Sequence, residues 1–303
     1  MNTRIVFMGS PDFALPTLQA LHEHYQVVGV VTQPDRPAGR GRQPQASPVK
    51  QAAQSLGLEV YQPVSLRKPE VLDHLAAWAP DLIVVAAFGQ ILPKAVLDLP
   101  PKGCLNVHAS LLPRWRGASP IQAAIASGDD HSGVTIMLMD EGLDTGPILS
   151  QRSVPLPFGI TGSQLSKQLA ELGARTLIEI LPSYLDGMVA PLPQNENEAT
   201  YAPMLKKSDG LLDFNRTALE LTRKVNAYQP WPGTYFNFNS RQLKVLAAHP
   251  HDTFDSSIGA HYIVNESPAV GTAQGFLVLD RVQPEGKKPM SGADFLRGQP
   301  NWL

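Results

Sequence analysis

Short runs rich in Val and Ile alternate with helical patterns in the first half of the chain, and this alternation limits the fold more than any other feature. The runs occupy residues 5–8, 27–31, 82–87 and 134–139. Nearly continuous apolar runs are typical of strands that are buried on both faces of a parallel sheet. Strands separated by helices of about 10–15 residues form βαβ units. The first half therefore predicts a parallel sheet covered by helices.

The helices between these runs have recognisable starts. Ser47 precedes Pro48, which is the pattern of an N-cap followed by Pro at the first helical position. Residues 69–79 carry apolar side chains at helical spacing. Thr161 and Gln164 form a capping-box pattern, which predicts a long helix to about residue 180.

The pattern changes after residue 190. Residues 191–203 have no apolar period and predict a linker. Thr217 and Glu220 form another capping box, and short alternating strands follow, with a hairpin around residues 239–241. One helix with several short strands indicates a small barrel or open β-roll. We expect domains at 1–190 and 206–303, joined by a linker at 191–205.

Composition excludes several classes of protein. Cys104 is the single cysteine, so neither an internal disulfide framework nor a cysteine zinc cluster is possible. The chain contains no run of 18 or more apolar residues, so we expect no membrane-spanning helix. The first ten residues predict a strand rather than a secretory signal. We expect a cytoplasmic protein without membrane contact. Residues 206–303 contain 11 Lys and Arg against 9 Asp and Glu, which permits an anionic partner there.

One segment contains polar side chains inside an apolar strand pattern. Asn106 and His108 are two residues apart, so they lie on one face near the strand's carboxyl end, where α/β sheets bind ligands. A lone buried His is more often a satisfied core residue, but two polar neighbours on one buried face need partners. The loop after residue 139 could aim one of its carboxylates at the His. Such a trio suits acid–base and oxyanion chemistry.

Other chemistries are less well supported. Residues 9–13 lack the glycine pattern of a dinucleotide cradle. The acidic loop at 140–144 is not an EF-hand, and no His pair accompanies it, so we expect no metal. Cys104 shares the face of Asn106 and His108 in regular alternation, but a small buried hydrophobe is the simpler interpretation. Acyl transfer without a covalent enzyme intermediate fits these residues best.

Residues 106–117 and 140–148 resemble the formyltransferases that use 10-formyltetrahydrofolate. Asn106, His108 and Asp144 match that family's spacing, and the resemblance implies that these three residues are catalytic. The chain departs from the usual pattern at Trp115, where Tyr is common, and at Arg42, where Lys is common. Residues 249–275 match poorly, with Ala-Gln-Gly at 273–275 where Gly-Asp-Gly is common, which leaves details of the second domain open.

Four further segments, 32–42, 206–210, 229–235 and 282–290, resemble the branch of this family that formylates methionine on initiator tRNA. The implied fold is α/β: a Rossmann-like, mostly parallel sheet with helices on both faces, and a smaller C-terminal OB-like β-barrel. The resemblance implies that the folate is bound by Phe88, Gly89, Ile91, Leu92, Ser110, Leu111, Leu112, Pro113, Asp140 and Glu141. The expected tRNA-binding residues are Arg36, Arg40, Arg42, Lys206, Lys207, Lys287 and Lys288, with Lys224 adding to the positive charge.

The resemblance therefore implies two substrates: 10-formyltetrahydrofolate as formyl donor and initiator Met-tRNA as acceptor. We expect the enzyme to be a monomer and to need no metal. Two alternatives belong to other classes. The first is a folate-dependent formyltransferase or hydrolase that acts on a small amine or on water. The second is an RNA-binding protein whose α/β domain has lost its activity.

Overall fold

The structure is a computed structural model that describes residues 3–38, 43–253 and 257–303. Within these ranges the chain forms two compact units. The first contains residues 1–120, 132–154 and 166–202, and the second contains residues 121–131, 155–165 and 203–303. Two short segments between the strands of the first unit therefore belong to the second.

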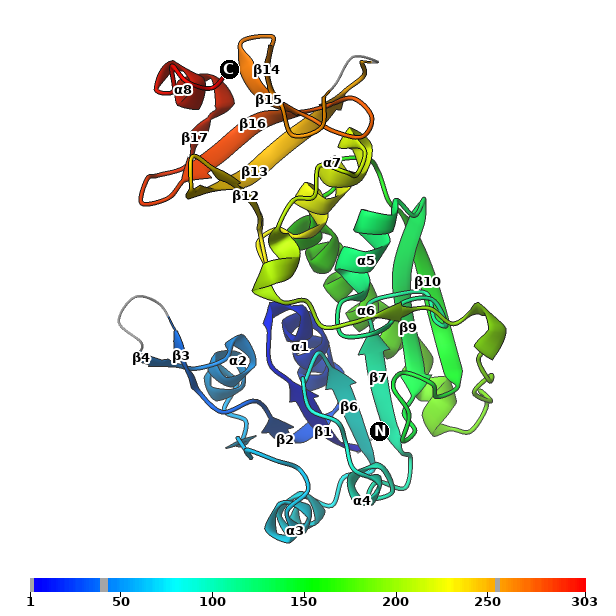
Figure 1. The fold of residues 1–303 in the computed structure, drawn as a ribbon. Helices are drawn as coiled ribbons and strands as arrows, with labels where there is room; N and C mark the ends of the chain where they lie inside the picture. Colours follow the sequence, from blue (N-terminus) through cyan, green and yellow to red (C-terminus); the bar gives the residue numbers. More distant parts are fainter. Residues whose placement is uncertain (1–2, 39–42, 254–256) are drawn as a thin grey trace. The chain divides into compact units, whose positions relative to one another are not determined.

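The first unit is built on a seven-stranded, mostly parallel sheet (Figure 1). Its strands β1, β2, β5, β6 and β7 run parallel, and β9 pairs antiparallel with β7. Figure 1 shows β10 on the far side of β9. In spatial order the strands are β10 (Ile148–Pro155), β9 (His131–Leu138), β7 (Cys104–His108), β6 (Leu82–Ala86), β1 (Arg4–Gly9), β2 (Gln26–Val31) and β5 (Val60–Tyr61).

Helices cover both faces of this sheet, as the apolar runs predict. Alternate residues of β1 belong to different hydrophobic clusters: Ile5 and Phe7 to one, Val6 and Met8 to the other. The first cluster contains residues of α1 (Leu15–His24), α2 (Pro48–Ser55) and α6 (Gly162–Leu185). The second contains residues of α3 (Pro69–Ala77) and α4 (Lys94–Leu97). A 3-10 turn, η1 (Asp12–Ala14), precedes α1.

The predicted caps are present. The Ser47 hydroxyl accepts a hydrogen bond from the backbone N–H of Lys50 at the start of α2. Thr161 and Gln164 bond reciprocally before α6. That helix continues to Leu185, beyond the expected end near residue 180, because the buried Leu181 and Leu185 extend its apolar stripe.

Two small sheets complete the first unit. The strands β3 (Arg36–Ala38) and β4 (Gln43–Gln45) form an antiparallel pair. The strands β8 (Arg116–Gly117) and β11 (Tyr201–Ala202) pair in parallel. Together with the 3-10 turn η2 (Glu196–Glu198), β11 lies in the segment for which the sequence predicted a linker.

The second unit contains an antiparallel sheet packed against α7 (Ala218–Ala227). The Thr217–Glu220 capping box opens this helix, as predicted. The strand order is β12 (Thr234–Phe238), β13 (Arg241–His251), β16 (Phe276–Pro284), β15 (Ser267–Gly271) and β14 (His261–Val264), with β17 (Met290–Ser291) beside β16. The predicted hairpin joins β12 to β13 through Asn239 and Ser240, which both have positive φ. The other elements are α5 (Pro120–Ser127), η3 (Lys207–Gly210) and α8 (Gly292–Arg297).

No sequence pattern predicted α8. This helix has only six residues, too few to show an apolar period. Its one signal is the N-cap, in which the Ser291 hydroxyl accepts from the backbone N–H of Asp294. None of the helices in the described ranges is both long and apolar enough to cross a membrane.

Candidate active site

Strand β7 presents two polar side chains on one face of the sheet. Asn106 lies opposite Met137 and His108 opposite Thr135 in the pairing with β9. His108 is the last residue of the strand and is buried. Parallel strands bring their carboxyl ends to one edge, so the chain places both polar groups where such sheets form sites.

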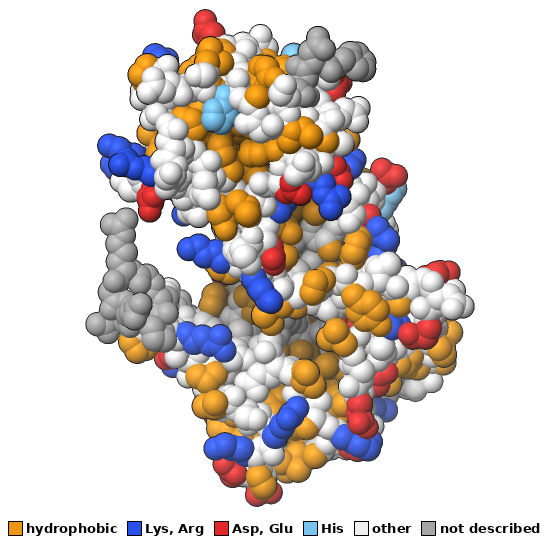
Figure 2. All heavy atoms as spheres, in the orientation of Figure 1, with side chains coloured by type: hydrophobic (Ala, Val, Ile, Leu, Met, Phe, Trp, Pro, Cys, Tyr) orange, Lys and Arg blue, Asp and Glu red, His pale blue; other side chains and the backbone are white. Residues whose placement is uncertain are grey.

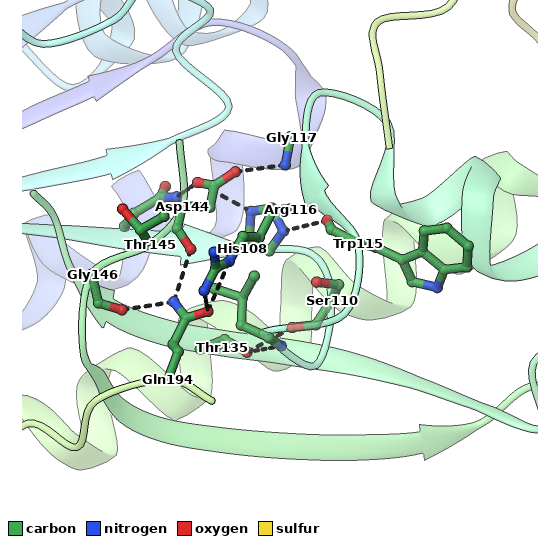
Figure 3. A network of polar contacts seen from close by, with 12 residues as sticks. His108, Ser110, Trp115, Arg116, Gly117, Thr135, Asp144, Thr145, Gly146 and Gln194 are labelled. Carbon is green, nitrogen blue, oxygen red and sulfur yellow. Dashed lines mark hydrogen bonds and ion pairs between the residues drawn. The ribbon is translucent and has the colours of Figure 1, made fainter. Parts of the chain in front are cut away.

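Asp144 reaches these side chains from the loop that follows β9. The loop turns back at once, because the N–H of Leu138 donates to the carbonyl of Pro147. Asp144 has a left-handed backbone, with φ of 54°. Its Oδ1 accepts from Asn106 Nδ2 at 3.4 Å and lies 3.6 Å from His108 Nδ1 (Figure 3). The three predicted side chains therefore meet around one carboxylate.

The second ring nitrogen of His108 has a different partner. Nε2 lies 3.1 Å from the carbonyl oxygen of Trp115. A carbonyl oxygen only accepts hydrogen bonds, so Nε2 carries a proton. Nδ1, which faces Asp144, can then donate only when the ring is a cation. In this geometry Nε2 keeps its proton as a hydrogen-bond donor, and Nδ1 is the ring nitrogen that can gain or lose a proton.

A buried hydroxyl organises the turn after β7. Thr135 Oγ1 donates to the carbonyl of Ser110 at 2.7 Å and accepts from the N–H of Leu112 at 3.1 Å. The Gln151 side chain donates both to Thr135 Oγ1 and to the Leu112 carbonyl. These bonds connect the turn at residues 110–112 to β9 and β10 and fix its position on the sheet.

A second polar group, absent from the sequence-based site, adjoins the loop that follows β7. The Arg116 side chain is fully buried and donates to Gln194 Oε1 through Nε and Nη2. It also makes a bidentate pair with Glu196, each contact 2.8 Å. These hydrogen bonds raise the pKa of Arg116 and lower the pKa of Glu196. No motif marked Gln194, because it lies in the polar stretch predicted as a linker.

Gln194 connects this group to Asp144. Its Nε2 donates to the carbonyl oxygens of Asp144 and Gly146, at 2.8 and 2.7 Å. The N–H of Gly117, next to Arg116, donates to Asp144 Oδ2 at 2.8 Å. Asp144 is therefore held through both its backbone and its carboxylate (Figure 3).

Comparison with known proteins identifies the family. Residues 3–181 match the model described as formyl transferase, and residues 204–300 match the formyl transferase C-terminal domain. The chain belongs to the formyl transferase family.

Two sequence relatives of this formyl transferase show how far the similarity extends. A methionyl-tRNA formyltransferase from Roseiflexus castenholzii is 47% identical over 302 residues, covering 98% of this chain and 96% of the relative. The methionyl-tRNA formyltransferase from Myxococcus xanthus is also 47% identical, over 298 residues, 97% of this chain and 95% of the relative.

Solved structures share its fold. HypX from Aquifex aeolicus in complex with tetrahydrofolic acid has a TM-score of 0.65 at 18% identity, covering 99% of this chain and 47% of HypX. An N-formyltransferase from Helicobacter canadensis, in complex with folinic acid and dTDP-3-aminofucose, has a TM-score of 0.67 at 16% identity. That match covers 94% of this chain and all of the other.

The residues predicted to bind folate occupy three loops of the formyl transferase. Ser110, Leu111, Leu112 and Pro113 follow β7, and Asp140 and Glu141 precede Asp144. An ion pair between Lys94 and Glu141, 3.7 Å, connects the acidic loop to the segment after β6, which holds Phe88, Gly89, Ile91 and Leu92. Two of the three loops that carry the predicted residues thus adjoin one another.

The side chains of the predicted folate-binding residues differ in how accessible they are to a ligand. Phe88, Leu92, Ser110 and Leu112 are buried, and Phe88 and Leu92 belong to the second hydrophobic cluster. Ile91 is 73% exposed. Ser110 is occupied by a hydrogen bond to the carbonyl of Arg114, and Asp140 accepts from Thr145 within its own loop. A ligand would therefore meet backbone groups and exposed apolar atoms rather than all ten side chains.

The predicted tRNA-binding residues lie in both units. Arg36 is exposed in β3 and donates to Gln33, while Arg40 and Arg42 lie outside the described residues. Lys206 and Lys207 are exposed at η3, and Lys287 and Lys288 are exposed in the turn before β17. Lys224 differs from these: its Nζ donates to the Leu211 carbonyl, and burial lowers its pKa.

A depression of about 760 Å³ in the first unit borders Arg36. Its lining includes Asp12, Gln33, Ser47 and Gln51. Gln33 also donates to the carbonyl of Phe88, so this depression adjoins the segment predicted to bind folate. On the face seen in Figure 2, Lys and Arg side chains occur singly or in small groups, with hydrophobic and uncharged surface between them.

Proposed function

We propose that this formyl transferase moves the formyl group of 10-formyltetrahydrofolate to the α-amine of methionine carried by initiator tRNA. The observation that carries the proposal is the meeting of Asn106, His108 and Asp144 around one carboxylate. The names of relatives that are 47% identical over nearly the whole chain support the tRNA substrate. A structural neighbour with bound tetrahydrofolate supports the donor.

The chemistry needs a stabilised oxyanion. The neutral amine attacks the formyl carbon, and the carbonyl oxygen gains negative charge. Asn106 has two amide hydrogens; one faces Asp144, and the other would donate to this oxygen. Removal of one such donor typically raises the barrier by about 2.7–4 kcal/mol.

His108 and Asp144 would move the proton. When the tetrahedral intermediate collapses, the bond from carbon to N10 breaks, its electron pair goes to N10, and N10 takes a proton. The attacking amine loses one proton in exchange, and this proton would return the His108 ring to the cation. His108 as a cation would supply the N10 proton from Nδ1, because Trp115 holds the Nε2 proton. Asp144 would stabilise that cation and orient the ring.

The donor's polar edge and flat ring would meet the three loops that carry the predicted folate residues. Exposed Ile91 offers apolar contact, and the backbone groups of these loops offer hydrogen bonds. The exposed lysines of the second unit, together with Arg36, Arg40 and Arg42, would contact tRNA phosphates. We propose domains at 1–190 and 206–303 with a connection at 191–205, and a monomer that acts in the cytoplasm.

One assay tests the proposed reaction. The protein is mixed with 10-formyltetrahydrofolate labelled in the formyl group and with initiator Met-tRNA, and label is sought on methionine. Uncharged tRNA and free methionine serve as controls, and nucleotide-sugar amines test the small-amine alternative. Label on a small amine alone would reject the tRNA substrate. A folate titration without binding would favour the RNA-binding alternative.

Arg40 and Arg42 give a separate prediction. We expect Arg40→Ala combined with Arg42→Ala to raise KM for Met-tRNA and to leave folate affinity unchanged, because guanidinium groups bind phosphates. The rise in KM should shrink at high salt, where phosphate contacts weaken. Unchanged kinetics with both substrates would contradict a role for these residues.

A further inference from the structure

The segment 194–202 falls between the two stretches matched to the family, which end at residue 181 and begin at residue 204. It nevertheless contacts both loops of the site. The N–H of Trp115 donates to Thr200 Oγ1 at 2.9 Å, and the N–H of Arg116 donates to the Thr200 carbonyl at 2.8 Å. The N–H of Ala118 donates to the carbonyl of Ala202. The segment thus aligns the loop whose Trp115 carbonyl accepts from His108.

The same segment holds the Asp144 loop through Gln194. Two carbonyls of that loop, those of Asp144 and Gly146, converge on the single amide Nε2. Oε1 of the same amide accepts from Arg116 twice, which fixes the amide orientation because only oxygen can accept. Gln194 therefore joins the two loops through opposite ends of one side chain.

The contacts leave little room for adjustment. A Cβ on Gly146 would lie 1.9 Å from the Leu138 carbonyl oxygen, and one on Gly117 would lie 2.7 Å from that of Ala202. Asp144 itself keeps a positive φ that non-glycine residues rarely adopt. A strained residue of this kind persists when its surroundings hold it, and Gln194 bonds its own carbonyl.

We propose that Gln194 and Arg116 are positioning residues for formyl transfer, and that the segment 194–202 is part of the active site. Gln194 holds the Asp144 loop so that the carboxylate faces His108 Nδ1, and Arg116 fixes the orientation of the Gln194 amide. This inference rests on the proposed catalytic role of His108 and Asp144. A displacement of about 1 Å in such a group can lower turnover by about 100-fold.

The test measures kcat and KM for both substrates in Gln194→Ala. We expect kcat to fall by about tenfold to 100-fold with both KM values unchanged, because both ends of this amide are bonded to protein groups and it would act only through Asp144. We also expect an altered pH profile of kcat, because Asp144 would no longer be set against the ring. Asn197→Ala is the matched control: its exposed side chain lies in the same segment but outside this network.

A second variant separates positioning from folding. Gln194→Glu keeps an oxygen for Arg116 but replaces the N–H donor with oxygen, so it retains the Arg116 contact and loses both carbonyl bonds. We expect a folded protein with native folate affinity and a reduced kcat, and a lower melting temperature because a carboxylate oxygen would face two carbonyl oxygens. Wild-type kcat and pH profile in Gln194→Glu would overturn the inference, even where Gln194→Ala fails to fold.

His108→Ala, assayed beside these variants, separates the two proposals. If His108→Ala retains turnover, the catalytic trio itself is wrong. If His108→Ala loses turnover while Gln194→Glu behaves as wild type, the trio stands and the positioning role fails.

Discussion

Among the histidine–carboxylate pairs of the described residues, His249–Asp280 and His108–Asp144 differ sharply in exposure, and the pair with the shorter distance is the less promising one. His249 Nδ1 lies 2.8 Å from Asp280 on the antiparallel sheet of the second unit, with the two side chains 50% and 41% exposed. His108 Nδ1 lies 3.6 Å from Asp144, with side chains 6% and 14% exposed. In the buried pair each member has a further partner: the Trp115 carbonyl for His108, and the Gly117 N–H for Asp144.

The difference teaches that distance alone does not identify a catalytic pair. An exposed ion pair interacts through water, and salt screens it, so it contributes about 0–1 kcal/mol. A buried pair is costly unless hydrogen bonds satisfy both members, and those bonds also fix its orientation. Four experiments test whether the two pairs differ in this way.

The largest effect should come from the buried histidine. We expect His108→Ala to lower kcat on the order of 10³-fold, because proton transfer to N10 loses its donor. Folate affinity, measured by fluorescence titration, should survive. His249→Ala is the matched control and should keep wild-type turnover. Equal losses in both variants would remove the distinction between the pairs.

Replacing the buried carboxylate should lower kcat less than replacing the buried histidine does. Asp144→Asn keeps an oxygen that can accept from Gly117 but removes the charge beside His108. We expect kcat to fall by about 10²-fold in single-turnover formylation. Asp280→Asn makes the same chemical change in the exposed pair and should leave turnover intact. A normal rate in Asp144→Asn would show that His108 needs no charged partner.

The exposed pair should show only a small effect on stability. In a double-mutant cycle of His249→Ala and Asp280→Ala, we expect a coupling free energy of about 0.2–1 kcal/mol at low salt. In 1 M salt that coupling should disappear, because the Debye length falls to about 3 Å. A coupling that persists in 1 M salt would mean that the pair is shielded from water.

The reactivity of Cys104 tests whether β7, the strand that carries Asn106 and His108, stays buried. We expect the Cys104 thiol not to react in the folded protein. Burial raises the pKa of the Cys104 thiol to about 12. Only the thiolate is a good nucleophile, so the native protein should resist iodoacetamide at pH 8. Mass spectrometry should find the adduct only after unfolding. Rapid labelling of native protein would show that the second hydrophobic cluster opens.

Much of the fold could be predicted from local pattern. Each apolar run became a buried strand of the first sheet, and the caps at Ser47, Thr161 and Thr217 opened helices. Such features depend on residues within a few positions of one another, which the sequence displays directly. The same logic placed Asn106 and His108 on one face of β7.

The missed features depend on distant parts of the chain. Arg116 and Gln194 are separated by 78 positions, and both lie in stretches without an apolar period. A polar segment predicts a loop or linker, whether it is solvated or buried against a site. Only its hydrogen-bond partners distinguish the two cases, and these become visible once the loops are folded.

Local sequence pattern was enough for the layered α/β architecture, the helix caps and the placement of Asn106 and His108 on one strand face, because strand alternation and capping act over short distances. Asp144 was named only through the resemblance to the family. The tertiary structure alone decided that Asp144 turns back toward β7, that the Trp115 carbonyl occupies His108 Nε2, and that Gln194 connects both loops. The reason is physical. A buried polar group must find its partner wherever the fold brings one, and no local rule specifies that partner.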